Sequence, residues 1–106
     1  MIKIEIFRTS VGKVSGYAVT GHSDTAEYGQ DIVCAGISSL AQTALLGIGK
    51  HLHREVDYKV ASGDLRVKLK SEPDDLTEAI LETMILGFVE IEKINPKSVR
   101  ILEHRR

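Results

Sequence analysis

The sequence predicts an α+β fold, a two-layer sandwich in which a mixed sheet of about five strands carries two helices on one face, in the order ββαββαβ. Three observations predict this fold. Four segments alternate between polar and apolar side chains, as half-buried strands do. Two longer segments repeat their apolar residues at helical intervals. The alternation leaves one face of the sheet polar, so both helices are expected on the other face.

The first half of the chain is predicted to form two strands and a helix. The opening residues "MIKIEIFR" place three isoleucines on one face of a strand, and residues 15–21 are predicted to pair with it. Residues 23–30 have no sustained periodicity and predict a polar loop. Apolar residues recur at helical intervals from about Asp31, and this helix is expected to end by His53.

The second half is predicted to form a hairpin, a helix and a closing strand. The segment "EVDYKVASGDLRVKLK" alternates on both sides of Ser62-Gly63, which predicts a hairpin turn there. A second helix is predicted to begin at Pro73 and to stop before Asn95-Pro96, and "SVRILE" reads as the last strand. The predicted core positions of the second helix are Leu76, Ile80, Met84, Gly87, Phe88 and Ile91.

Composition bounds the class of protein. The chain has 106 residues, of which 42% are hydrophobic and 27% charged, so we expect one globular domain over residues 1–106. A single cysteine excludes an internal disulfide and suits a reducing cytoplasm. We expect neither a signal peptide nor a membrane-spanning run. A net charge of −1 argues against direct RNA binding driven mainly by phosphates.

Both predicted helices are apolar on more than one side. The first contains "LAQTALLGIG", almost without charge, and the second contains the uninterrupted run "MILGFV". A two-layer fold buries only one side of each helix, so we expect a homodimer that uses a helical surface. The alternative is deep burial within one chain.

The segment "TGHSDTAEYGQDIVCAGISS", residues 20–39, contains the only cysteine and raises a question of chemistry. Cys34 is either a small buried residue or a nucleophile with His22 as its base. Cys34 is expected in the opening turn of the first helix, where free amides and the helix dipole stabilise a thiolate. His22 follows the second strand, and a loop over residues 23–30 is long enough to bring its imidazole to the helix.

Glycines and backbone amides complete the candidate site. Gly21 and Gly29 flank the loop and could act as hinges. If Cys34 attacks a carbonyl, amides near Cys34 and Ala35 are expected to stabilise the oxyanion.

Two polar residues could support this chemistry or be purely structural. Asp31 could cap the helix, or it could orient His22 as the third member of a triad does. Ser38 lies one helical turn after Cys34 and could donate to the sulfur or to a substrate oxygen, or it could be a small packing residue.

Two other motifs carry weaker signals. His51 and His53 lie near a helix end without an accompanying carboxylate or thiol cluster, so we expect no metal site and no cofactor. Arg66, Lys68 and Lys70 form a basic stripe on the fourth strand, which usually keeps a sheet face soluble. A contact with RNA or the ribosome is the alternative for this stripe.

Residues 21–38 also carry a family resemblance. Gly21-His22, a variable loop, Gly29 and then "DIVCAGIS" resemble the signature of the ribosomal-processing cysteine protease family, Prp. The resemblance spans the chain in length and element order, and it implies His22 and Cys34 as catalytic residues, with Asp31 and Ser38 as the motif's aspartate and serine. One departure is glycine at position 36, where alanine is more frequent.

The resemblance implies a dimeric cysteine endopeptidase. Its implied substrate is a large-subunit ribosomal protein, which loses a short N-terminal extension before ribosome assembly. Residues 23–30 would then order over the substrate and decide when His22 meets Cys34. The competing hypotheses are a non-enzymatic module that associates with RNA or the ribosome, and a cysteine acyltransferase.

Overall fold

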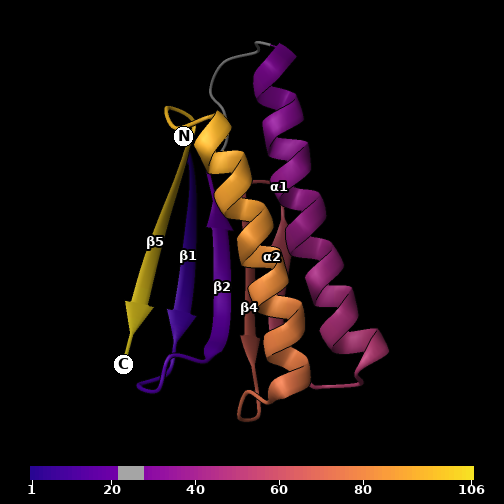
Figure 1. Cartoon of the computed structure of the whole chain (residues 1–106). Helices are drawn as coiled ribbons and strands as arrows, with labels where there is room; N and C mark the ends of the chain where they lie inside the picture. The colour runs from indigo at the N-terminus through magenta and orange to yellow at the C-terminus, as the bar shows by residue number, and fades with distance from the viewer. Residues whose placement is uncertain (22–27) are drawn as a thin grey trace.

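The computed structural model describes residues 1–21 and 28–106, and of residues 28–31 only the backbone. Its elements follow the predicted order ββαββαβ (Figure 1). They are β1 (Ile2–Arg8), β2 (Val14–Thr20), α1 (Tyr28–Leu46), the π-helical turn η1 (Gly47–His51), β3 (Val56–Ala61), β4 (Asp64–Leu69), α2 (Asp75–Ile94) and β5 (Val99–Arg105).

The five strands form one mixed sheet in the order β3-β4-β2-β1-β5. Neighbouring strands are antiparallel except β1 and β5, which run parallel. Both helices pack side by side on one face, and the other face carries no helix (Figure 1). The predicted two-layer sandwich is therefore confirmed.

The core lies between the sheet and the helices. Ile2, Ile4 and Ile6 of β1 are at most 1% exposed, as their alternation predicted. The buried Tyr17 hydroxyl on β2 donates to the carbonyl of Ala41 at 2.8 Å, which ties α1 to the middle of the sheet. Burial of this hydroxyl raises the pKa of Tyr17.

The first helix begins earlier than predicted. α1 starts at Tyr28, so Asp31 is its fourth residue and Cys34 its seventh. The expectation that Cys34 lies in the opening turn is therefore wrong. The signal was absent because Tyr28, Gly29 and Gln30 add no apolar residue to the periodic stripe that marks the rest of the helix.

The second helix has a different phase from the predicted one. Asp74 caps α2 in a capping box, in which its carboxylate accepts from the amide of Thr77 while the Thr77 hydroxyl accepts from the amide of Asp74. This pairing fixes Thr77 at 2% exposure and leaves Leu76 56% exposed. The buried residues of α2 are Thr77, Leu81, Met84, Ile85 and Phe88.

The helical stretch Ile32–His51 is unusually apolar. Its mean hydropathy is 1.7, and by length and composition alone it could cross a membrane. No such run was expected from the sequence, and in this structure Val33, Ile37 and Ala41 of the stretch pack into the core beside the sheet. Only 28% of this stretch is buried, so much apolar helical surface stays uncovered in one chain.

Candidate active site

Cys34 lines a cleft of about 390 Å³ between α1 and the tip of the β3–β4 hairpin, the Cys34 cleft. Val19, near the end of β2, also lines it. The residues that line it are Ile2, Val19, Gly21, Cys34, Ile37, Ser38, Gln42, Val60, Ala61, Ser62, Gly63, Asp64 and Leu65.

Helix α1 contributes the polar side of this cleft. Cys34, Ser38 and Gln42 follow one another at intervals of four residues, which places them on one face of the helix. Cys34 is half-buried and packs against the core, and Ser38 is exposed. Cys34 therefore packs against the core and also lines the cleft, so it is not sealed in the interior.

Two glycines hold the opposite side. The chain leaves β2 at Gly21 with a φ of +92°, and the amide of Gly21 donates to the carbonyl of Gly63 at 3.0 Å. A Cβ at position 21 would collide with the carbonyl oxygen of Met1. Only glycine satisfies both the dihedral and this close approach, so the point from which the chain departs toward residue 22 is fixed.

Three predicted site residues, His22, Gly29 and Asp31, lie either outside the described residues or in the part of α1 where only the backbone is described. His22 lies outside the described residues, as does most of the loop predicted over 23–30, so the pairing of His22 with Cys34 stays a prediction. Gly29 lies inside α1 rather than on the flank of a loop. Asp31 also lies inside α1, so the N-cap role proposed for it is wrong; its side chain is not described.

The helix position of Cys34 bears on the predicted oxyanion site. Only the first four amides of an α-helix lack a partner within the helix. Cys34 and Ala35 are the seventh and eighth residues of α1, so regular helix geometry already engages their amides. Their assignment to the oxyanion stays a prediction, and it requires the first turns of α1 to unwind when substrate binds.

One carboxylate stands at the rim of the cleft. Asp64 accepts from Lys59 Nζ and from Arg66 Nε, both at 2.8 Å. These hydrogen bonds from Lys59 and Arg66 lower the pKa of Asp64, so it stays ionised. In the described part of the chain, no three histidine, cysteine, aspartate or glutamate side chains gather as a metal site would require.

Gln42 and the hairpin tip line the cleft but were not predicted from the sequence. Gln42 could have been found, because it lies two helical turns after Cys34 on the same face. The hairpin tip could not, because its place depends on β4 pairing with β2, which sets Asp64 beside Thr20. Such pairing between distant segments leaves no local pattern in the sequence.

Comparisons with known proteins agree on one family. The family model described as "Cysteine protease Prp" matches residues 1–100. The ribosomal processing cysteine protease Prp of Staphylococcus aureus is 30% identical over 104 residues, covering 95% of this chain and 97% of the relative. The Prp of Bacillus subtilis is 27% identical over 107 residues, covering 95% and 96%.

Solved structures show the same fold. The essential ribosomal processing protease Prp from S. aureus, in complex with a substrate peptide, matches with a TM-score of 0.89 and 27% identity, covering 98% of this chain and 100% of that one. The same enzyme with a covalently linked product peptide matches at 0.88 with 28% identity. SMU.848 from Streptococcus mutans, 23% identical with a TM-score of 0.87, shows the fold alone.

Proposed function

The chain belongs to the cysteine protease Prp family, and from this premise we propose that it is an endopeptidase acting on a ribosomal protein. The proposed reaction removes a short N-terminal extension from a large-subunit ribosomal protein before the ribosome is assembled. Cys34 is the proposed nucleophile and His22 the proposed base.

One observation carries the assignment of Cys34. A cysteine protease acts through a thiolate, and this chain has a single cysteine, which lines a cleft rather than the sealed core. Gly21, on the opposite side of the cleft, directly precedes His22 in the chain. This placement supports His22 as the imidazole that serves Cys34.

The proposed mechanism has two halves. His22 takes the proton from the Cys34 Sγ, and the thiolate attacks the carbonyl carbon of the scissile bond. The carbonyl then re-forms, the carbon–nitrogen bond breaks, and His22 gives its proton to the leaving amine. A water molecule, deprotonated by His22, attacks the thioester carbonyl, and the released thiolate recovers the proton.

Substrate binding is proposed to complete the site. The oxyanion would be held by amides near Cys34 and Ala35 once the first turns of α1 unwind. With the N-cap role excluded, Asp31 is proposed to orient His22. Gly21 would be the hinge of the segment that leads to His22, whereas Gly29 lies inside α1 and is not proposed as a hinge. The loop predicted over residues 23–30, most of which lies outside the described residues, would order over the bound peptide.

The test is cleavage of a large-subunit ribosomal protein that carries an N-terminal extension. Cys34→Ala and His22→Ala are expected to abolish cleavage, and Arg66→Ala with Lys68→Ala is the control that should retain it. The product should appear as a new N-terminus by mass spectrometry. Absence of cleavage by the parent protein with every extension tried would overturn the proposal.

A matched pair of serines tests the geometry of the Cys34 cleft. Ser38 lines the cleft and Ser39 does not, although both are exposed on α1. Ser38→Ala is expected to lower kcat/KM by about tenfold, the effect of one lost hydrogen bond in the transition state. Ser39→Ala is expected to leave it unchanged, and equal losses in both variants would exclude a role for Ser38.

The proposed enzyme is a homodimer in the cytoplasm, where ribosomal proteins are made. The support for dimerisation is the apolar surface that both helices leave uncovered. Leu46 on α1 is 52% exposed and Leu86 on α2 is 68% exposed. A second copy packed on this helical surface would bury them.

A further inference from the structure

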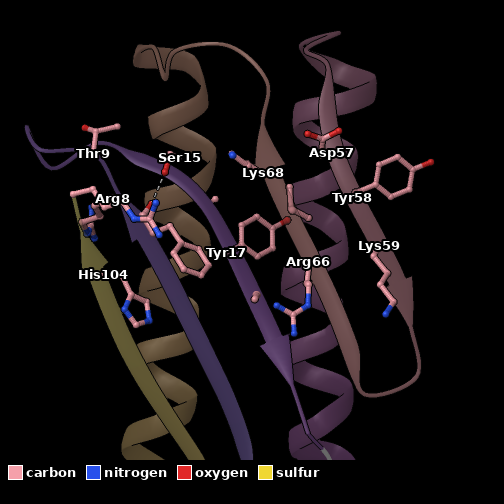
Figure 2. Close-up of a pocket in the computed structure, with 15 residues that line it drawn as sticks. Arg8, Thr9, Ser15, Tyr17, Asp57, Tyr58, Lys59, Arg66, Lys68 and His104 are labelled. Carbon is pink, nitrogen blue, oxygen red and sulfur yellow. Dashed lines mark hydrogen bonds between the residues drawn. The ribbon is translucent and has the colours of Figure 1, made fainter.

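The sheet face opposite the helices holds a second concavity, the sheet trough, of about 680 Å³. It lies across β5, β1, β2, β4 and β3, at the end of the sheet away from the Cys34 cleft. Figure 2 views this face with the helices behind the strands, and Arg66, Lys68 and His104 lie around the trough.

The floor of the trough is bare backbone. Phe7, Gly16 and Lys68 are neighbours in register across β1, β2 and β4. Gly16 and Ala18 therefore occupy the central strand where larger side chains would fill the space. A Cβ at position 16 would lie 2.6 Å from the carbonyl oxygen of Val67, so this position must stay without a side chain. The absence of a side chain at this position leaves room for a planar ring.

One side of the trough carries an aromatic pair. The rings of Phe7 and His104 stack with centroids 5.2 Å apart and planes 18° from parallel. The His104 side chain is 46% exposed, and its Nε2 lies 3.6 Å from the Glu5 carboxylate. A stacked pair that remains open to solvent offers a surface on which a further planar ring can stack.

The other side carries positive charge. Arg8, Lys59, Arg66, Lys68 and Arg106 line the trough together with one carboxylate, Asp57. Arg8 is already paired with Glu82 on α2 and with Glu103 on β5, so the positive charge open to a ligand comes from the other four cations. The chain as a whole has a net charge of −1, so positive charge is concentrated on this face. Lys59 and Arg66 share the single carboxylate of Asp64, and within the described residues Lys68 makes no ion pair. An anionic ligand would complement these groups.

We propose that the sheet trough binds single-stranded RNA, with one or two bases stacked on Phe7 and His104 and phosphates on Arg66 and Lys68. Stacking platforms beside a cationic groove are the general mode of single-strand recognition. The low net charge of the chain argues against RNA binding through charge spread over the whole surface, but it does not argue against a local cationic site. A second copy of this chain does not fit, because it would place the same cations opposite one another.

Asp57 favours RNA over DNA. Its carboxylate repels a phosphate but accepts a hydrogen bond from a ribose 2′-hydroxyl, the group that DNA lacks. The side chain is 69% exposed on the β3 side of the trough; Lys70 Nζ lies 3.7 Å from its Oδ1, and the remaining exposed carboxylate surface can meet a ribose. RNA, rather than DNA, is therefore the proposed ligand.

This binding does not depend on the proposed protease activity. The trough and the Cys34 cleft share no residue, and they lie on opposite faces of the sheet. The Cys34→Ala variant is expected to bind RNA as the parent protein does, so failure of one proposal would leave the other testable.

Fluorescence anisotropy with labelled single-stranded RNA of about eight nucleotides tests the proposal. The full chain is titrated at low salt against this RNA, the DNA of the same sequence, and the RNA as a duplex. Binding of the single-stranded RNA is expected to be at least about tenfold tighter than binding of either competitor. Equal affinity for DNA would contradict RNA as the ligand, and a higher affinity for the duplex would contradict the stacking of bases on Phe7 and His104.

Two pairs of variants separate the trough from general charge. Arg66→Ala with Lys68→Ala is expected to weaken binding at least tenfold and to reduce the salt slope by about 0.7 for each lost phosphate contact. Lys93→Ala with Lys97→Ala removes equal charge from exposed positions outside the trough and should change the affinity less than twofold. Equal weakening by both pairs would overturn the site.

The aromatic pair has its own test. Phe7→Leu keeps an apolar side chain on β1 and is expected to weaken binding by about tenfold, the lower range for one lost stacked base. His104→Ala removes the exposed ring and is expected to act in the same direction. Circular dichroism of both variants should match that of the parent protein, which would establish that they fold. Unchanged affinity in folded Phe7→Leu and His104→Ala would overturn the stacking of bases at this site.

Discussion

The amide of Gly21 donates to the carbonyl of Gly63 at 3.0 Å, and this bond joins the end of β2 to the tip of the β3–β4 hairpin. Both glycines have positive φ, +92° and +72°. The segment that leads to His22 is therefore anchored to the same hairpin tip that closes the Cys34 cleft. The backbone geometry of Gly21 therefore sets the point at which the chain continues to His22, the proposed base.

Gly21→Ala is expected to reduce stability and cleavage together. A side chain there is strained at positive φ and meets the Met1 carbonyl, for a cost of about 2 kcal/mol or more in the free energy of unfolding. Urea denaturation and kcat/KM measure the two effects. Gly12→Ala is the matched control, because Gly12 has a φ of +89° but its Cβ would meet only the flexible Arg105 side chain. Lost cleavage in Gly12→Ala as well would contradict a role specific to Gly21.

Gly36→Ala is expected to stabilise the protein. Position 36 lies in the interior of α1, and an added Cβ would meet only the Ile91 Cδ1 at 3.4 Å. Alanine should therefore raise the free energy of unfolding by about 0.5–1 kcal/mol. In Gly87→Ala the Cβ would approach Leu40 Cδ1 to 2.8 Å, so the same substitution on α2 should destabilise. A shared sign for the two urea midpoints would contradict this account of the helix contact.

Asp74 is expected to make stability depend on pH in the acid range. The amide of Thr77, then the Arg54 side chain, lower the pKa of Asp74 below its ordinary value of 3.8. A carboxylate with a lowered pKa in the folded state contributes stability above about pH 4 and loses it as the pH falls through the folded pKa. Urea midpoints measured from about pH 6 to pH 2 should fall less steeply in Asp74→Asn.

Asparagine at position 74 can still cap α2, so the comparison isolates the charge from the cap. Asp75→Asn is the matched control, because it removes one carboxylate without touching the contact with Arg54. An acid slope in Asp74→Asn as steep as that of the parent protein would show that the hydrogen bonds of Asp74 do not contribute.

Leu86→Glu is expected to convert the proposed dimer into a monomer. Leu86 lies on α2 with 68% of its surface exposed, and a carboxylate buried in an apolar interface is strongly unfavourable. Light scattering at about 10 μM should give twice the chain mass for the parent protein and the chain mass for the variant. Val11→Glu, at a similarly exposed position between β1 and β2, should remain dimeric. A monomeric parent protein would exclude the dimer.

The sequence predicted what local patterns encode. Alternation identified the strands, and Ser62-Gly63 identified the hairpin turn, because each depends on neighbouring residues. The start of α1 and the phase of α2 were missed, since Gln30 adds nothing to the apolar stripe and Thr77 is turned inward by a capping contact. Of the Cys34 cleft, Gly21, Cys34 and Ser38 were predicted from the sequence. The hairpin tip was not, because it reaches the cleft through pairing between distant strands.

The parallel pairing of β1 with β5 determines when the sheet can close during synthesis of the chain. Ile2 lies opposite Val99 in that pair, so the second hydrogen-bonding edge of β1 stays open until the last strand is synthesised. An open edge can pair with another chain, and closure between distant segments is slow. During translation, this edge of β1 remains unpaired until β5 has been made, and the nascent chain is most prone to wrong pairing in that interval.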